Sequence, residues 1–230
     1  MHCLLITVTQ IRLHLTRNKV QAARGNILKK IREALAQPTP IPFPKSEGQS
    51  SVFTPLEQDI EVEFAERFTG LQGKFAFCFD EKELVQQFNQ LAAEKGWKAI
   101  YCIDHNITDT LRGSLNFLND FSNLAGCDVA VTGCEYLVAR TGSIVMSAAE
   151  QSGRNTSVYA PVHICIAYTS QLVYDIKDAL EGVKEKYGTS LPSLITFATG
   201  PSRTADIEKT LVVGVHGPKE VYVFLVDDKS

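Results

Sequence analysis

The chain has 230 residues, of which 44% are hydrophobic and 21% charged, and this composition excludes a wholly disordered protein. Its net charge of −3 excludes the global basic field of a general nucleic-acid binder, and no apolar run reaches the roughly 18 residues that a membrane-spanning helix needs. The length is that of one domain, or of one domain with an appendage.

The amino-terminal segment differs from the rest in charge. Its first 36 residues carry seven lysines and arginines against one acidic residue, a net charge of +6 that leaves −9 for the remainder. Residues 26–36 place aliphatic side chains at helical spacing, which predicts an amphipathic helix, and four prolines in residues 37–45 predict an extended connector. We therefore predict a basic arm over residues 1–45 and an α/β domain over residues 46–230. The arm can contact an acidic partner or lie in solvent, and the solvated state is the commoner one.

Helix signals in the main body begin at Thr54. The segment Thr54-Pro55-Leu56-Glu57 combines an N-cap residue, a proline at the first helical position and a glutamate three residues after the cap. Asp80 and Gly96 bracket a second helix in the same manner. The predicted helices cover residues 54–70, 80–95, 108–118 and 170–187, with a turn or short helix at residues 134–140.

Apolar segments between these helices predict strands. Several of them, such as VHICIAY at residues 162–168, are apolar on both faces, which is typical of strands buried between helix layers. The sequence therefore predicts an α/β fold with a mostly parallel sheet. No glycine-rich dinucleotide or P-loop motif is present. The predicted strands cover residues 74–79, 98–103, 128–132, 141–147, 162–168, 193–199 and 220–226.

The first candidate site follows the predicted strand at residues 193–199. A Gly-Pro pair turns the chain, and a short helix is predicted to begin at about Thr204. Helix amides beside the guanidinium of Arg203 would suit a carboxylate or a phosphate. The alternative, an N-cap beside a surface arginine, stays open. The candidate anion-binding residues here are Gly200, Ser202, Arg203, Thr204 and Asp206.

The second candidate site is the loop before the last strand, where His216 lies between Gly214 and Gly217. Glycines let other groups approach the imidazole, and a neutral histidine can act as an acid or a base near pH 7. Because successive loops of a parallel sheet can meet at one strand edge, Arg203 and His216 are the candidate catalytic residues. In the alternative, His216 hydrogen-bonds a backbone carbonyl and fixes the turn.

The third candidate site is the turn formed by Thr141, Gly142 and Ser143, together with His163 further along the chain. Hydroxyl groups on both sides of a glycine can bind an anion, and the loop at residues 148–156 is a candidate lid. Ordinary turn chemistry, with threonine and serine as local hydrogen-bonding residues, is the alternative.

The six cysteines are dispersed, lie mostly in apolar runs and form no C-x-x-C pair. This pattern predicts buried free thiols in a reducing compartment, with no metal or iron–sulfur site in this chain. The amino terminus has no basic region before its apolar stretch and no small-residue cleavage site, so we expect no signal peptide and a cytoplasmic protein.

The carboxyl-terminal segment carries a long motif: GPSRTADIE at residues 200–208, a spacer, and then GVHGP at residues 214–218 before an apolar strand. It resembles the lactate-utilization protein C family (LutC/YkgG, the LUD domain). DVAVTG, TGS, PVHI and NILKKIREAL are similar to earlier segments of that family, so the resemblance covers about residues 20–228. Family members more often have an acidic residue where this chain has Arg140, and residues 1–20 have no counterpart.

The resemblance implies a doubly wound α/β fold similar to the sugar-isomerase and CoA-transferase (NagB/RpiA/CoA transferase-like) superfamily. It also implies a subunit of a system that oxidises L-lactate to pyruvate, with the iron–sulfur clusters in partner proteins and no cofactor in this chain. A component of an L-lactate dehydrogenase complex, a non-catalytic binding or assembly module, and a stand-alone transferase or isomerase acting on a CoA or phosphate compound are the open alternatives. The sequence leaves monomer and homo-oligomer open as well.

Overall fold

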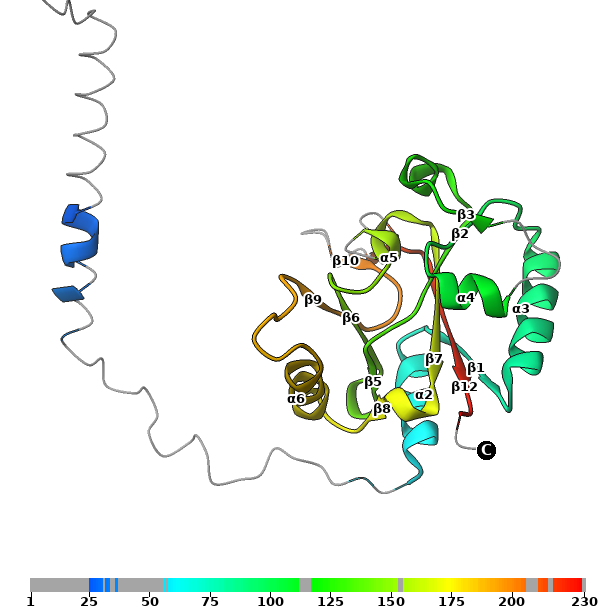
Figure 1. Ribbon diagram of the computed structural model, residues 1–230, viewed down its shortest axis with the longest axis horizontal. Helices are drawn as coiled ribbons and strands as arrows, with labels where there is room; N and C mark the ends of the chain where they lie inside the picture. The colour runs from blue at the N-terminus through cyan, green and yellow to red at the C-terminus, as the bar shows by residue number, and fades with distance from the viewer. Residues whose placement is uncertain are drawn as a thin grey trace, which may run out of the picture. The chain divides into compact units, whose positions relative to one another are not determined.

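The computed structural model describes residues 25–30, 32–33, 36, 56, 58–111, 117–152, 155–205, 211–214 and 217–228 (Figure 1). The chain separates into two compact units, Met1–Thr54 and Pro55–Ser230. In the first unit residues 25–30 and 32–33 are helical, and they overlap the helix expected at residues 26–36. The domain boundary placed after residue 45 stays a prediction.

The second unit is built on a six-stranded sheet in the order β1-β12-β7-β4-β2-β3, and every neighbouring pair is parallel. This confirms the mostly parallel α/β fold. The two longest strands, β7 and β12, are mostly apolar and match the segments expected from sequence. The strands are β1 (Lys74–Cys78), β2 (Ile100–Tyr101), β3 (Phe117–Leu118), β4 (Val129–Thr132), β7 (Val162–Tyr168) and β12 (Glu220–Val226).

A second sheet, in the order β8-β5-β6-β9, was not expected. Its strands β5 and β9 both pair antiparallel with β6, so residues 193–199 do not close the parallel sheet as predicted. The segment at residues 134–140, expected as a turn or helix, contains a strand because Tyr136-Leu137-Val138 pairs with β6. The strands are β5 (Tyr136–Val138), β6 (Ser143–Ser147), β8 (Leu172–Val173) and β9 (Ile195–Ala198).

The helices cover both faces of the parallel sheet. Their caps explain where they begin: the Asp80 carboxylate accepts a hydrogen bond from the Glu83 amide, and Gly96 ends the helix in the left-handed conformation. The helices are α2 (Ile60–Gly70), α3 (Glu81–Lys95), α4 (His105–Thr110), α5 (Thr156–Tyr159) and α6 (Ile176–Tyr187), with 3₁₀ turns at Phe121–Gly126, Ala139–Thr141 and Thr169–Gln171.

Three helix predictions were wrong at their ends. The helix expected to begin at Thr54 begins at Ile60. Thr54 itself lies outside the described residues. The helix expected from Ser170 begins at Ile176, because Asp175 and Asp178 form a capping box. The helix expected at residues 108–118 begins at His105, because the Asp104 side chain caps it, and has ended by Leu111.

Two apolar clusters hold the layers together. Alternate residues of each strand face opposite sides, so Ile164 packs with α3 residues such as Phe88, whereas Cys165 packs with Phe64 and Phe68 of α2. The second sheet covers the same side as α2, and α6 covers its outer face (Figure 1). No helix in the part of the chain that the structure describes is long and apolar enough to cross a membrane.

Candidate functional site

Residues 203–205 form a strand, and the helix predicted to begin at about Thr204 is wrong. Strand β10 (Arg203–Ala205) pairs antiparallel with β11 (Leu211–Val213). Both segments contain β-branched residues, which favour extended backbone, and the pairing outweighs the local helix-start signal. The helix amides expected to hold an anion are therefore missing from Arg203–Ala205. Asp206 lies outside the described residues.

The two carboxyl-terminal loops do meet. The Ser202 amide donates to the Pro218 carbonyl at 2.9 Å, and the Gly214 amide donates to the Ser202 carbonyl at 3.0 Å. Gly217 lies so close to Ser202 that a Cβ on it would be 2.8 Å from the Ser202 Cβ. His216 lies outside the described residues.

The meeting point lies at the amino end of the parallel sheet. The Lys219 amide donates to the Pro161 carbonyl at 2.8 Å, and β12 and β7 begin immediately after these two residues. The reason is that β9, which precedes the first loop, belongs to the second sheet and runs antiparallel to β6.

A hollow of about 460 Å³ opens beside this meeting point. Lys219 is the only charged residue among the described residues that line the hollow. The sequence analysis did not identify it, although it directly follows the GVHGP motif. Glycines on one wall leave the backbone open to a ligand, and an ammonium group favours an anion. The lining residues are Val158, Tyr159, Ala160, Pro161, Gly214, Gly217 and Lys219.

Arg203 points elsewhere. Its guanidinium donates to the carbonyl of Leu71, which follows the end of α2, and the residue does not line the hollow. Gly200 packs against the same carbonyl, because a Cβ on Gly200 would lie 2.7 Å from the Leu71 oxygen. These contacts attach the hairpin to α2, and the role of Arg203 in anion binding stays a prediction.

The Thr141-Gly142-Ser143 turn forms a separate hydroxyl chain. The Thr141 and Ser143 hydroxyls are 2.8 Å apart, and the Ser143 hydroxyl is 2.8 Å from that of Thr199. Gly142 packs against the backbone of α2. The chain ties β6 to the end of β9, as the turn-chemistry alternative requires, and these residues do not line the hollow.

His163 is buried inside the sheet, two residues beyond Pro161. Its side chain is 1% exposed, and its Nε2 atom is 2.8 Å from the Thr132 hydroxyl. Burial lowers the pKa of His163 to about 4, so the imidazole is neutral at pH 7. Its Nδ1 atom has no hydrogen-bond partner among the described residues. His163 does not line the hollow, and its role in anion binding stays a prediction.

Arg140, where the family more often has an acidic residue, pairs with Asp175 at 2.6 Å. Glu135 is fully buried and accepts hydrogen bonds from Ser147, Lys186 and Tyr187 at 2.5–2.6 Å. Burial alone would raise the pKa of Glu135, but these hydrogen bonds outweigh it and lower the pKa. The carboxylates of Asp175 and Glu135 therefore stay ionised in the folded chain and form ion pairs with Arg140 and Lys186.

Glu150 is the exception among these carboxyl groups, and Glu150→Gln is expected to stabilise the protein at pH 8. Burial, and then the nearby carboxylate of Glu135, raises the pKa of Glu150 to about 7. Because the folded pKa is raised, the stability that the neutral group contributes is lost as the pH rises from its unfolded value of 4.5 through about 7. We expect the melting temperature to rise by about 5 °C at pH 8 after allowance for screening, and to change little at pH 4.

Thermal unfolding of both proteins at the two pH values measures this effect, with Glu181→Gln on the exposed face of α6 as the matched control. Equal gains at pH 4 and pH 8, or a gain as large in the control, would contradict the assignment.

No group of three or more metal-ligating side chains is arranged for a metal ion within the described ranges. The five cysteines that the structure describes are buried and free, as their apolar surroundings predict.

Comparison with known proteins identifies relatives for about half of the chain. "Lactate utilization protein C" of Bacillus velezensis is 38% identical over 104 residues, which cover 44% of this chain and 43% of that protein. The Bacillus subtilis protein of the same name is 36% identical over 104 residues, with 44% and 43% covered. The Geobacillus protein of that name is 34% identical over 129 residues, with 55% and 52% covered. The aligned part thus spans about half the length of these curated relatives.

A solved structure has the same fold. The crystal structure of a DUF162 family protein from Deinococcus radiodurans aligns with a TM-score of 0.57 and 19% identity, and it covers 73% of this chain and 96% of that one. This agrees with the doubly wound α/β fold. The LUD domain model matches residues 62–226, a range that includes the parallel sheet, the second sheet and the hollow beside Lys219. The chain therefore belongs to the LUD domain family.

Proposed function

We propose that this chain is a subunit of an L-lactate utilization system and that it binds a small carboxylate in the hollow beside Lys219. The observation that carries the proposal is the placement of this lysine. It is the one cation among the described lining residues, and it lies beside the two glycines of the GVHGP motif. The chain's membership of the LUD domain family and the names of its curated relatives support lactate utilization as the process.

In this proposal the ammonium group of Lys219 pairs with the carboxylate of the ligand, while the apolar wall formed by Val158, Ala160 and Pro161 contacts its carbon chain. His216 supplies a hydrogen bond to the hydroxyl oxygen or accepts its proton. Arg203 does not line the hollow, and we propose it as an anion-binding group on the neighbouring loop, since a guanidinium has five donors and its bond to Leu71 uses one of them.

The oxidation of lactate to pyruvate releases two electrons and two protons. We propose that the electrons pass to iron–sulfur partner proteins and that the assembly works in the cytoplasm. This chain then binds and orients the substrate and moves a proton. A non-catalytic assembly module is the competing account, and it predicts no carboxylate affinity for the chain alone.

The variant Lys219→Met tests the binding site directly. Methionine keeps the length of the aliphatic stem and removes the charge, so we expect the affinity for sodium L-lactate to fall about five- to tenfold, as for the loss of one partly exposed charged hydrogen bond. Isothermal titration, or NMR titration for weak binding, measures this affinity. Lys177→Met is the matched control, because that exposed lysine lies on α6. Equal affinities in the two variants would rule out the Lys219 site.

The isolated chain is expected to bind no iron–sulfur cluster. Thiolates are the ligands of such clusters, and burial raises the pKa of Cys78 to about 11 and that of Cys102 to about 12, which keeps these thiols protonated. Anaerobic reconstitution with iron and sulfide, followed by metal analysis, tests this. Stoichiometric iron and sulfide in the purified chain would show that the clusters are not confined to partner proteins.

A further inference from the structure

Among the described residues, strand β1 forms one edge of the parallel sheet and has β12 as its single hydrogen-bonded neighbour. The Cys78 carbonyl faces β12, because it accepts a hydrogen bond from the Asp227 amide. The Phe77 carbonyl faces the other way, since it accepts from the Gln87 side chain, and the Phe79 amide likewise donates to Glu83. Odd-numbered residues of β1 therefore direct their backbone groups away from the sheet.

This alternation leaves an open stretch on the edge. Within the described part of the chain, the amide and carbonyl of Phe75 and the amide of Phe77 have no hydrogen-bond partner. An unpaired stretch of this kind can accept one further short strand, because its donors and acceptors have the spacing of a sheet ladder.

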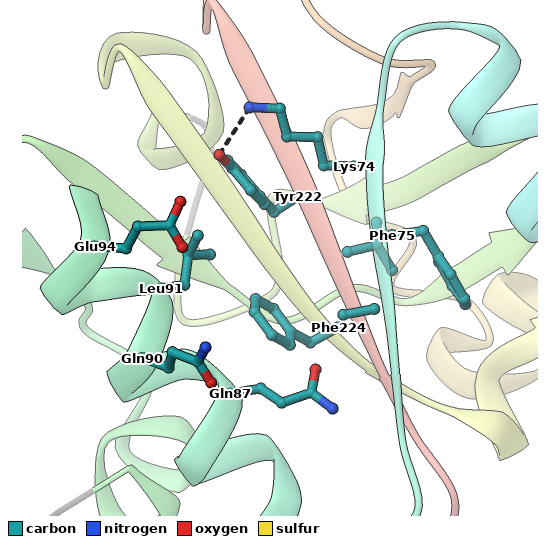
Figure 2. Close-up of a pocket in the computed structure, with 10 residues that line it drawn as sticks. Lys74, Phe75, Gln87, Gln90, Leu91, Glu94, Tyr222 and Phe224 are labelled. Atoms are coloured by element: carbon teal, nitrogen blue, oxygen red, sulfur yellow. Dashed lines mark hydrogen bonds between the residues drawn. The ribbon is translucent and has the colours of Figure 1, made fainter.

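A hollow flanks this edge on each face of the sheet. The first, about 360 Å³, lies between β1 and α3 and is floored by Ala76, Leu91 and Phe224 (Figure 2). The second, about 440 Å³, lies between β1 and α2 and is floored by Val62, Phe75 and Phe77. Figure 2 shows the Phe75 ring turned away from the α3 side chains, as alternation along a strand requires.

The two hollows differ in charge. All four charged residues that line the α2-side hollow are acidic: Asp59, Glu61, Glu66 and Asp227. The α3-side hollow has an apolar floor, with the amides of Gln87 and Gln90 and one charge of each sign, Lys74 and Glu94, around it, so its described lining has no net charge. A lysine or arginine therefore suits the α2-side hollow, with its stem on the phenylalanine rings and its charge at the acidic rim. An aliphatic side chain suits the α3-side hollow.

We propose that β1 is a docking edge for an extended segment of a partner protein in which basic and aliphatic residues alternate. Backbone hydrogen bonds to Phe75 and Phe77 hold the added strand, and its alternate side chains enter the two hollows. A second copy of this chain fits less well. Antiparallel pairing of two β1 edges would bring α2 and its acidic residues next to their own copies, and like charges repel.

The probe is the acetylated and amidated peptide Val-Lys-Val-Arg-Val-Lys-Val. Its binding is expected to slow hydrogen exchange at the Phe75 and Phe77 amides about tenfold, as measured by NMR, because both amides become paired. A peptide of the same composition with its three basic residues consecutive should give much weaker protection. The proposal is overturned if neither amide is protected at about 1 mM peptide, where a complex of only about 4 kcal/mol would be half formed, or if both peptides protect equally.

Charge reversal tests the acidic hollow. The double variant Glu61→Lys with Glu66→Lys should bind the alternating peptide about tenfold more weakly, since attraction becomes repulsion at two positions. Glu181→Lys with Glu185→Lys makes the same charge change on α6 and should leave the affinity unchanged. Equal losses in both variants would mean nonspecific attraction and would overturn the proposal. Sedimentation that shows a dimer dispersed by the peptide would assign the edge to a second copy instead.

Discussion

Gly142→Ala is expected to destabilise the protein by about 4 kcal/mol, enough to unfold much of it at 37 °C. Gly142 has a φ of +60°, and an alanine held there costs about 1 kcal/mol in backbone strain. A Cβ at this position would also lie 2.7 Å from the Phe68 amide nitrogen and 2.9 Å from the Arg67 carbonyl carbon. Both are backbone atoms of α2, so overpacking adds about 3 kcal/mol.

Gly96→Ala separates the two contributions. Gly96 has a similar φ of +68°, but a Cβ on it meets nothing within 4 Å. Urea unfolding should therefore give a loss of about 1 kcal/mol for Gly96→Ala, which is the strain alone. If the two variants lose the same stability, then the second sheet does not pack against α2 as closely as the structure indicates.

The second large expected effect is caused by His163. Its contribution to the free energy of unfolding is expected to fall by about 3 kcal/mol as the pH falls from 6.5 to about 4. Burial lowers the pKa of His163 from 6.5 to about 4 in the folded chain. The unfolded chain therefore takes up a proton first, and the stability that is present above pH 6.5 is lost as the pH falls. Each pKa unit corresponds to about 1.4 kcal/mol.

His163→Gln, which retains an amide for the Thr132 hydroxyl, should remove this pH dependence. The comparison is made at each pH between variant and parent, because Glu150 titrates in the same range and its contribution has the opposite sign. Urea unfolding at pH 7 and pH 4.5 measures the difference. A stability difference between parent and variant that is the same at pH 7 and pH 4.5 would mean that the imidazole is accessible to solvent in the folded state.

The sequence was most informative where an element carries its own signal. Strands β7 and β12 are apolar on both faces apart from His163 and Glu220, and such a pattern is typical of a strand covered on both sides. Helix α3 has a cap at both ends, and its predicted bounds were almost correct. In these elements local preference and tertiary packing agree.

The sequence was least informative where pairing partners decide the structure. Tyr136-Leu137-Val138 is too short to distinguish a strand from a turn, and only its pairing with β6 makes it a strand. The Arg203–Ala205 segment has a helix-start signal, but its pairing with β11 makes it a strand. Lys219 is a candidate only because of the tertiary structure. Its amide donates to the carbonyl of Pro161, a residue far away in the sequence, and both residues line the hollow.

The most direct test of the proposed function is lactate-dependent electron transfer with the chain's iron–sulfur partners. We expect reduction of an artificial electron acceptor by L-lactate only when this chain is combined with those proteins, and we expect Lys219→Met and His216→Asn to lower the rate while leaving the melting temperature unchanged. Arg203→Lys should lower it as well, if the guanidinium reaches the ligand. Full activity of the partner proteins without this chain, or unchanged rates in all three variants, would contradict a substrate-binding role at the Lys219 hollow.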